Sequence, residues 1–143
     1  MSKSTPWLVT SDKLLDTQDA FVVPNIEKAT LENKFYRKVE FTTLQFQLVY
    51  MTLLVGEDIP KETHEDVTQF FRIEKGQGQF VVNGRTIDLQ ADGVIVVPAG
   101  TEHYVKNSSD SEPLQMYVIY APREHPATRR DERQPPEDAE NSE

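Results

Sequence analysis

The strongest constraint on the fold is a succession of short β-prone segments between residues 35 and 122. These segments are rich in β-branched, aromatic and aliphatic residues, and the turns between them break any long helical period. Asn83-Gly84 separates two of the expected strands, residues 79–82 and 85–89. This dipeptide is the strongest short signal for a β-hairpin, because both residues tolerate positive φ. Many short strands at this spacing predict an all-β sandwich or barrel.

Two of the expected strands, residues 46–54 and 114–120, are apolar on both faces. In the first, Leu48 and Tyr50 lie on one face, while Val49 lies on the other. A sheet with one face in water would instead alternate apolar and polar residues. We therefore expect the N-terminal arm, a second subunit or both to cover one sheet face, and we predict a homodimer.

The composition divides the chain into three parts: an N-terminal arm (1–31), a barrel (32–126) and a C-terminal tail (127–143). The arm has two apolar clusters, residues 6–9 and 21–24, with Ser and Asp between them. It is expected to contain short extended pieces. Two interpretations remain open: a loosely packed leader, or a segment that covers a sheet face or reaches across a dimer.

The tail lacks the residues needed to build a core. From residue 127 onward the only apolar residues are Ala127 and Ala139, and acidic residues outnumber arginines. Pro135 and Pro136 interrupt any helix. We expect this acidic tail to be disordered.

Charge and cysteine content exclude several functions. The 143-residue chain has a net charge of −9, which disfavours binding to nucleic acid. It has no cysteine, so disulfides, thiolate metal sites and cysteine nucleophiles are excluded. No apolar run approaches the roughly 18 residues needed to span a membrane. Residues 1–10 also lack the apolar core of a signal peptide. We expect a cytoplasmic protein that contacts neither nucleic acid nor membrane.

The polar residues with potential chemistry are few. The chain has three histidines, of which His64 and His103 stand next to strands, while His125 stands near the tail and is not expected to be a ligand. In extended chain Glu62 and His64 point the same way. Gln69 follows on the next strand, and His103 on a later one. Taken singly, such residues are more often surface or core residues than ligands. Together, two imidazole nitrogens and two oxygens suit Mn²⁺, Fe²⁺, Ni²⁺ or Zn²⁺.

The spacing of these residues resembles the cupin superfamily. The first cupin motif is Gly-x5-His-x-His-x3-4-Glu-x6-Gly, and its spacing is repeated here by Gly56, Glu62, His64, Gln69 and Gly76. Two ligand positions differ, since Glu62 stands in place of a histidine and Gln69 in place of a glutamate. Both substitutes keep an oxygen donor, so the site is altered rather than erased.

The second cupin motif is Gly-x5-Pro-x-Gly-x2-His-x3-Asn. Pro98, Gly100, His103 and Asn107 match it, whereas the leading glycine, Gly93, is one residue closer than usual. The resemblance covers about residues 45 to 121. The residues in and around the two motifs look most like those of short single-domain cupins, which are often labelled mannose-6-phosphate-isomerase-like.

This resemblance implies a cupin double-stranded β-helix, or jelly-roll, barrel in which Glu62, His64, Gln69 and His103 hold a divalent metal ion. Cupins differ widely in activity, so the function stays open. We favour a redox-neutral enzyme of isomerase, epimerase or lyase type acting on a small sugar-like or keto-acid substrate. Its candidate acid–base residues are Tyr50 and Tyr120. The alternative is a non-catalytic cupin that binds a small ligand or metal. A metal-dependent dioxygenase is third. Common cupin oxygenases resemble three-histidine sites, whereas this chain has only two histidines in the motifs.

Overall fold

The computed structural model describes residues 19–136, and most of the regular structure in this range is β. The elements, in chain order, are α1 (Ile26–Glu32), β1 (Arg37–Thr42), β2 (Gln47–Leu53), β3 (Asp58–Glu62), β4 (Thr68–Lys75), β5 (Gln77–Val82), β6 (Arg85–Gln90), β7 (Val94–Val97), β8 (His103–Asn107), β9 (Leu114–Ala121) and β10 (Arg130–Asp131). No helix within this range is both long enough and apolar enough to cross a membrane.

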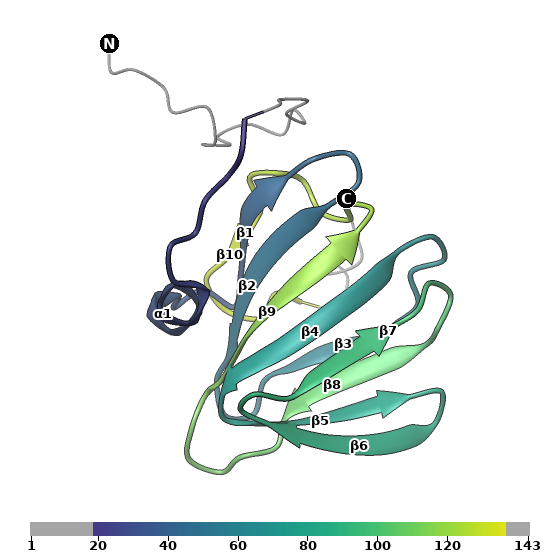
Figure 1. Cartoon of the computed structure of the whole chain (residues 1–143). Coiled ribbons are helices and arrows are strands. Elements are labelled where there is room, and N and C mark those ends of the chain that lie inside the picture. The colour runs from purple at the N-terminus through teal and green to yellow at the C-terminus, as the bar shows by residue number, and fades with distance from the viewer. Residues whose placement is uncertain (1–18, 137–143) are drawn as a thin grey trace.

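The strands form two antiparallel sheets that face one another (Figure 1). The larger sheet has the order β10-β1-β2-β9-β4-β7, and the smaller has the order β3-β8-β5-β6. Neighbouring strands are often far apart in the sequence, as expected for a jelly roll. The all-β barrel expected from the sequence is confirmed.

The Asn83-Gly84 hairpin is also confirmed. It joins β5 to β6, with Val82 paired to Arg85. Asn83 and Gly84 have φ values of 50° and 79°, the positive range that such a two-residue turn needs.

The hydrophobic core lies between the two sheets. Successive side chains of a strand point to opposite faces, so alternate residues enter the core. Val49, Met51 and Leu53 of β2 are fully buried members of this cluster. Phe80 and Val105 of the smaller sheet belong to the same cluster. Side chains of both sheets therefore meet in one core.

The other face of the larger sheet is partly covered by α1 and the residues that follow it. The side-chain amide of Gln115 on β9 donates to the Leu31 carbonyl (3.0 Å), and the Thr52 hydroxyl donates to the Asn33 carbonyl (2.8 Å). The expectation of only short extended pieces in the arm is corrected here, because residues 26–32 form a helix whose first turn is capped by Asn25. The arm's first apolar cluster lies outside the described residues.

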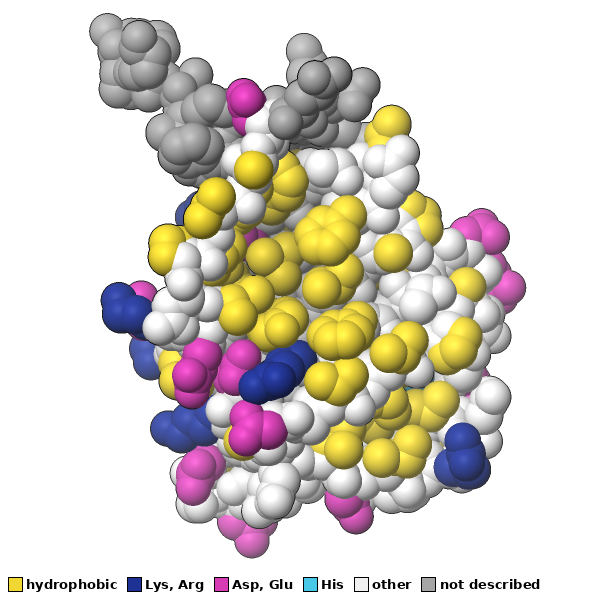
Figure 2. Space-filling model, in the orientation of Figure 1, with side chains coloured by type: hydrophobic (Ala, Val, Ile, Leu, Met, Phe, Trp, Pro, Cys, Tyr) yellow, Lys and Arg dark blue, Asp and Glu magenta, His cyan; other side chains and the backbone are white. Residues whose placement is uncertain are grey.

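Beyond α1, this outer face carries exposed apolar side chains. Phe46, Val94 and Val96 are 39%, 42% and 52% exposed. Figure 2 shows apolar side chains gathered over this side of the molecule, in the orientation in which β2, β9 and β4 face the viewer. The two-sided apolar pattern of the strands thus corresponds to a sheet with a core face and an apolar outer face.

Residues 127–136 lie against the barrel, which corrects the expected start of a disordered tail at residue 127. The short strand β10 pairs with β1, and there Arg37 forms an ion pair with Asp131 at 2.8 Å. Further along, Arg133 donates to the Thr52 carbonyl at 3.1 Å. Polar contacts hold this segment, so its lack of apolar residues wrongly indicated disorder. The rest of the expected tail, residues 137–143, lies outside the described residues.

Candidate metal centre

Three strands bring the residues of the two motifs together. Glu62 ends β3, Gln69 lies in β4 and His103 begins β8. Because β3 pairs with β8, Glu62 stands directly opposite His103. His64 follows β3 by two residues, and its carbonyl accepts a hydrogen bond from the Gly100 backbone (2.8 Å). The turn of the second motif is therefore tied to the first.

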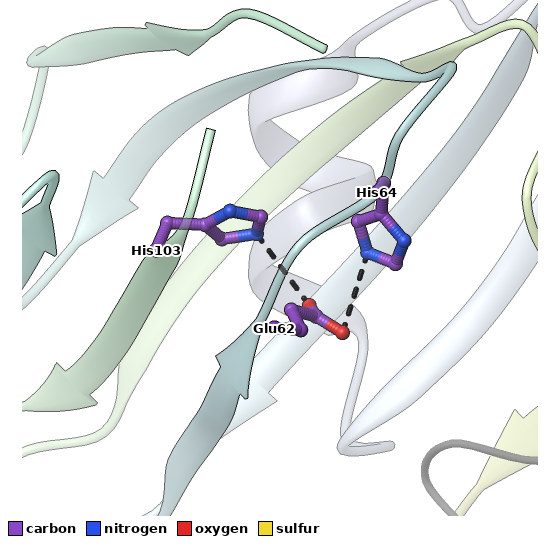
Figure 3. A group of neighbouring side chains, drawn as sticks. All are labelled: Glu62, His64 and His103. Atoms are coloured by element: carbon purple, nitrogen blue, oxygen red, sulfur yellow. Dashed lines mark ion pairs between the residues drawn. The ribbon is translucent and has the colours of Figure 1, made fainter. Parts of the chain in front are cut away.

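The two imidazoles converge on one carboxylate (Figure 3). Nε2 of His64 lies 3.3 Å from Oε1 of Glu62, and Nε2 of His103 lies 3.6 Å from Oε2 of the same residue. The three residues each offer a ligand atom, and these atoms all lie within 4.8 Å of one another. Such a cluster has the donors and the size to hold one metal ion.

The ring of His103 is oriented by the backbone. Its Nδ1 lies 2.9 Å from the Thr101 carbonyl, which can only accept a hydrogen bond. Nδ1 therefore carries a proton, and Nε2, once unprotonated, can present its lone pair to a metal ion. Gln69, 1% exposed, places its amide nitrogen 3.3 Å from that Nε2. A half-turn of the amide would present the oxygen instead, as a metal contact requires.

The charges in the cluster are strongly coupled. Burial raises the pKa of Glu62, but hydrogen bonds and charge from His103 and His64 outweigh it and lower this pKa to about 2. Burial lowers the pKa of His64, but hydrogen bonds and charge from Glu124 and Glu62 outweigh it and raise this pKa to about 10. Without a metal ion, His64 is thus an imidazolium between two carboxylates.

Glu124 is a site residue that the sequence analysis missed. It follows β9, and its Oε2 lies 3.3 Å from Nδ1 of His64. It stands beyond both motifs, so no spacing pointed to it. Its neighbour His125 is buried, with its ring 4.9 Å from that of Tyr120. Burial, with the charges of Arg37 and Arg129, lowers the pKa of His125 well below its ordinary value.

The two candidate tyrosines lie on opposite faces of the larger sheet. Tyr120 belongs to the core cluster, and its ring lies edge-on to His64, with centroids 6.3 Å apart. Tyr50 pairs with Tyr117 in the register of β2 and β9 and lies outside that cluster, on the outer face. Of the two, only Tyr120 adjoins the metal-type cluster.

An antiparallel barrel that brings two histidines and a carboxylate together is typical of small β-barrel proteins with a candidate metal site. The chain belongs to the cupin family: the family model described as a cupin domain matches residues 49–120. The cupin superfamily and the fold expected from the resemblance are thus confirmed.

Two relatives that share at least 40% of their aligned residues with this chain are uncharacterized proteins. An uncharacterized protein of Acanthamoeba polyphaga mimivirus is 40% identical over 126 residues, covering 85% of this chain and 78% of that protein. Uncharacterized protein YrkC of Bacillus subtilis is 45% identical over 113 residues, covering 74% of this chain and 59% of YrkC. The chain therefore matches little more than half of YrkC.

Among solved structures, that of BH2720 from Bacillus halodurans is similar with a TM-score of 0.77 and 36% identity. The match covers 87% of this chain and 95% of that protein. The fold of almost the whole BH2720 chain is therefore shared.

Proposed function

We propose that the chain binds one divalent transition-metal ion through His64, His103 and Glu62, with Gln69 as the weakest ligand. One observation carries this proposal: the Nε2 atoms of both imidazoles point toward the two oxygens of one carboxylate. Two nitrogens and two oxygens suit Mn²⁺, Fe²⁺, Ni²⁺ or Zn²⁺.

Metal titration of variants, with element analysis of protein purified without added metal, tests this proposal. His64→Ala and His103→Ala should abolish stoichiometric binding, and Glu62→Gln should weaken it strongly because the carboxylate charge is lost. Gln69→Ala should weaken it least, and Gln69→Glu should tighten it. Glu65→Gln, an exposed neighbour, is the matched control. A double histidine variant that binds metal as well as the parent would contradict the proposal.

We further propose that the site serves a redox-neutral enzyme acting on a small sugar-like or keto-acid substrate. A bound divalent ion would act as a Lewis acid on a substrate carbonyl or hydroxyl. Tyr120 is the candidate acid–base residue, because it is the tyrosine whose ring packs against His64. The cluster is largely buried, with side chains of Glu62 and His64 each 13% exposed, and this favours a small substrate.

Solvent exchange distinguishes this enzyme from a non-catalytic binder. The metal-loaded protein is incubated in D₂O with a panel of aldoses, ketoses and 2-keto acids, and NMR detects deuterium at the carbon next to the carbonyl. Tyr120→Phe should slow the exchange, whereas Tyr50→Phe on the outer face should leave it unchanged. Stoichiometric metal binding with no exchange on any substrate would favour the non-catalytic binder.

We propose that a second copy of the chain covers the apolar outer face, giving a homodimer. The support is the set of exposed apolar side chains that includes Phe46, Val94 and Val96. Sedimentation at micromolar concentration should show a dimer, and Val96→Lys should shift it toward the 16.4 kDa monomer. A parent protein that sediments only as a monomer would refute the homodimer.

A further inference from the structure

His64 lies between two carboxylates that come from different parts of the chain. Its Nε2 faces Glu62, two residues earlier, and its Nδ1 faces Oε2 of Glu124 at 3.3 Å. The side chains of His64 and Glu124 are both largely removed from solvent, at 13% and 21% exposed. Each ring nitrogen of His64 therefore has its own carboxylate partner.

The segment that carries Glu124 is held against the barrel by a buried side chain. Gln47, which is fully buried, accepts hydrogen bonds from the backbone N–H groups of Glu124 (3.0 Å) and His125 (2.8 Å). Its amide nitrogen donates to the His125 carbonyl (2.7 Å) and to the Thr42 hydroxyl (3.0 Å). The position of Glu124 is thus built into the fold.

The two site histidines have matching arrangements. At His103 the acceptor facing Nδ1 is the Thr101 carbonyl, at 2.9 Å. At His64 the acceptor facing Nδ1 is the Glu124 carboxylate. Metal-bound histidines in general donate their second N–H to a carboxylate or carbonyl, which fixes the tautomer and the ring orientation. Within residues 19–136, the group of ligand atoms close enough to share an ion includes Glu62 but not Glu124.

We propose that Glu124 is a positioning residue for the metal centre. Its carboxylate accepts the Nδ1 proton of His64, so that Nε2 of the same ring is held toward the ion. This inference rests on the proposed metal binding by His64 and His103. Without the acceptor, the ring is free to turn, and the second N–H must find water instead. Loss of such a partner generally weakens metal binding about 10–100-fold.

The test uses the full chain loaded with zinc alone, and it compares the parent with Glu124→Ala and Glu124→Gln. The readouts are zinc affinity and the ring N–H signals of the histidines in ¹H–¹⁵N NMR spectra. In Glu124→Ala the affinity should fall about 10–100-fold, and the His64 Nδ1–H signal should be lost to solvent exchange. The His103 signal should persist, because the Thr101 carbonyl still holds that proton. This signal reports that the fold and the rest of the site are intact.

Glu124→Gln separates the hydrogen bond from the charge. Its amide oxygen still accepts the proton, so the His64 signal should return and affinity should lie between those of the parent and Glu124→Ala. If both variants bind zinc like the parent, with the His64 signal retained in Glu124→Ala, the positioning role is overturned while the metal site stands. If charge alone matters, both variants weaken binding equally and the signal is retained, which also overturns it. A parent that binds no zinc overturns the metal site and this inference together.

Discussion

Gly56 and Gly76 are the first and last glycines of the first cupin motif, yet substitution by alanine should have very different effects at the two positions. Their backbones are nearly the same, with φ of +91° at Gly56 and +94° at Gly76. A Cβ added at Gly56 would meet nothing within 4 Å. At Gly76 it would lie 2.3 Å from the Pro113 carbonyl oxygen and 3.0 Å from Cα of Leu114. The obstruction at Gly76 is backbone, so no side-chain rotation relieves it.

The two sites share two free-energy terms, so the expected difference comes from a third term that acts at Gly76 only. A positive φ costs alanine about 1–2 kcal/mol at either position. The smaller entropy of the unfolded alanine chain offsets about 0.4–1 kcal/mol at both. These terms cancel in the comparison. Displacing the backbone around residue 113 adds about 1–3 kcal/mol at Gly76 only, the usual cost of overpacking.

Urea unfolding monitored by circular dichroism in the presence of a chelator measures this difference. Gly76→Ala should lose about 1–3 kcal/mol more of the free energy of unfolding than Gly56→Ala. In thermal unfolding, the same difference corresponds to a midpoint lower by about 2–12 °C. Equal losses in the two variants would show that the close approach of Pro113 does not constrain Gly76, and the reasoning would be refuted.

Three further predictions address the site and the C-terminal segment. Gln47→Leu should lower the free energy of unfolding by about 2–4 kcal/mol in urea titrations, because backbone groups of residues 124–125 lose their partners; an unchanged value would mean that the segment is held by other contacts. Deleting residues 127–143 should lower the thermal midpoint by about 5 °C or more, since β10 and its ion pair are lost, whereas deleting 137–143 should not. Equal midpoints for the two deletions would show that residues 127–136 add no stability. In metal-free protein, His64, with a pKa raised to about 10, adds stability that is complete below its ordinary value of 6.5 and is lost as pH rises to about 10. Glu62, with a pKa lowered to about 2, adds stability that is present above its ordinary value of 4.5 and is lost as pH falls to about 2. His125, whose pKa burial lowers well below its ordinary value of 6.5, removes stability as pH falls below that value. Thermal midpoints should therefore be highest near pH 6.5, and His64→Ala should remove most of the alkaline decline.

The sequence by itself determined the features that depend on local pattern. Short β-prone segments between turns predicted the strands, the Asn83-Gly84 turn predicted a hairpin, and the spacing of two motifs predicted which residues meet. Glu62 and His64 lie two residues apart near the end of one strand, so extended geometry alone aims them at the same place. The gathering of Gln69 and His103 with them followed from motif spacing that belongs to the whole family.

Only the tertiary structure decided what depends on contacts between distant segments. Nothing near Glu124 in the sequence indicates that a buried glutamine on β2 holds it beside His64. Likewise, both faces of β2 and β9 are apolar, so periodicity did not distinguish Tyr120 inside from Tyr50 outside. Residues 127–136 are ordered by polar partners supplied by other strands, which composition does not record. Local pattern specifies which side chains share a face, whereas packing specifies which faces and loops meet.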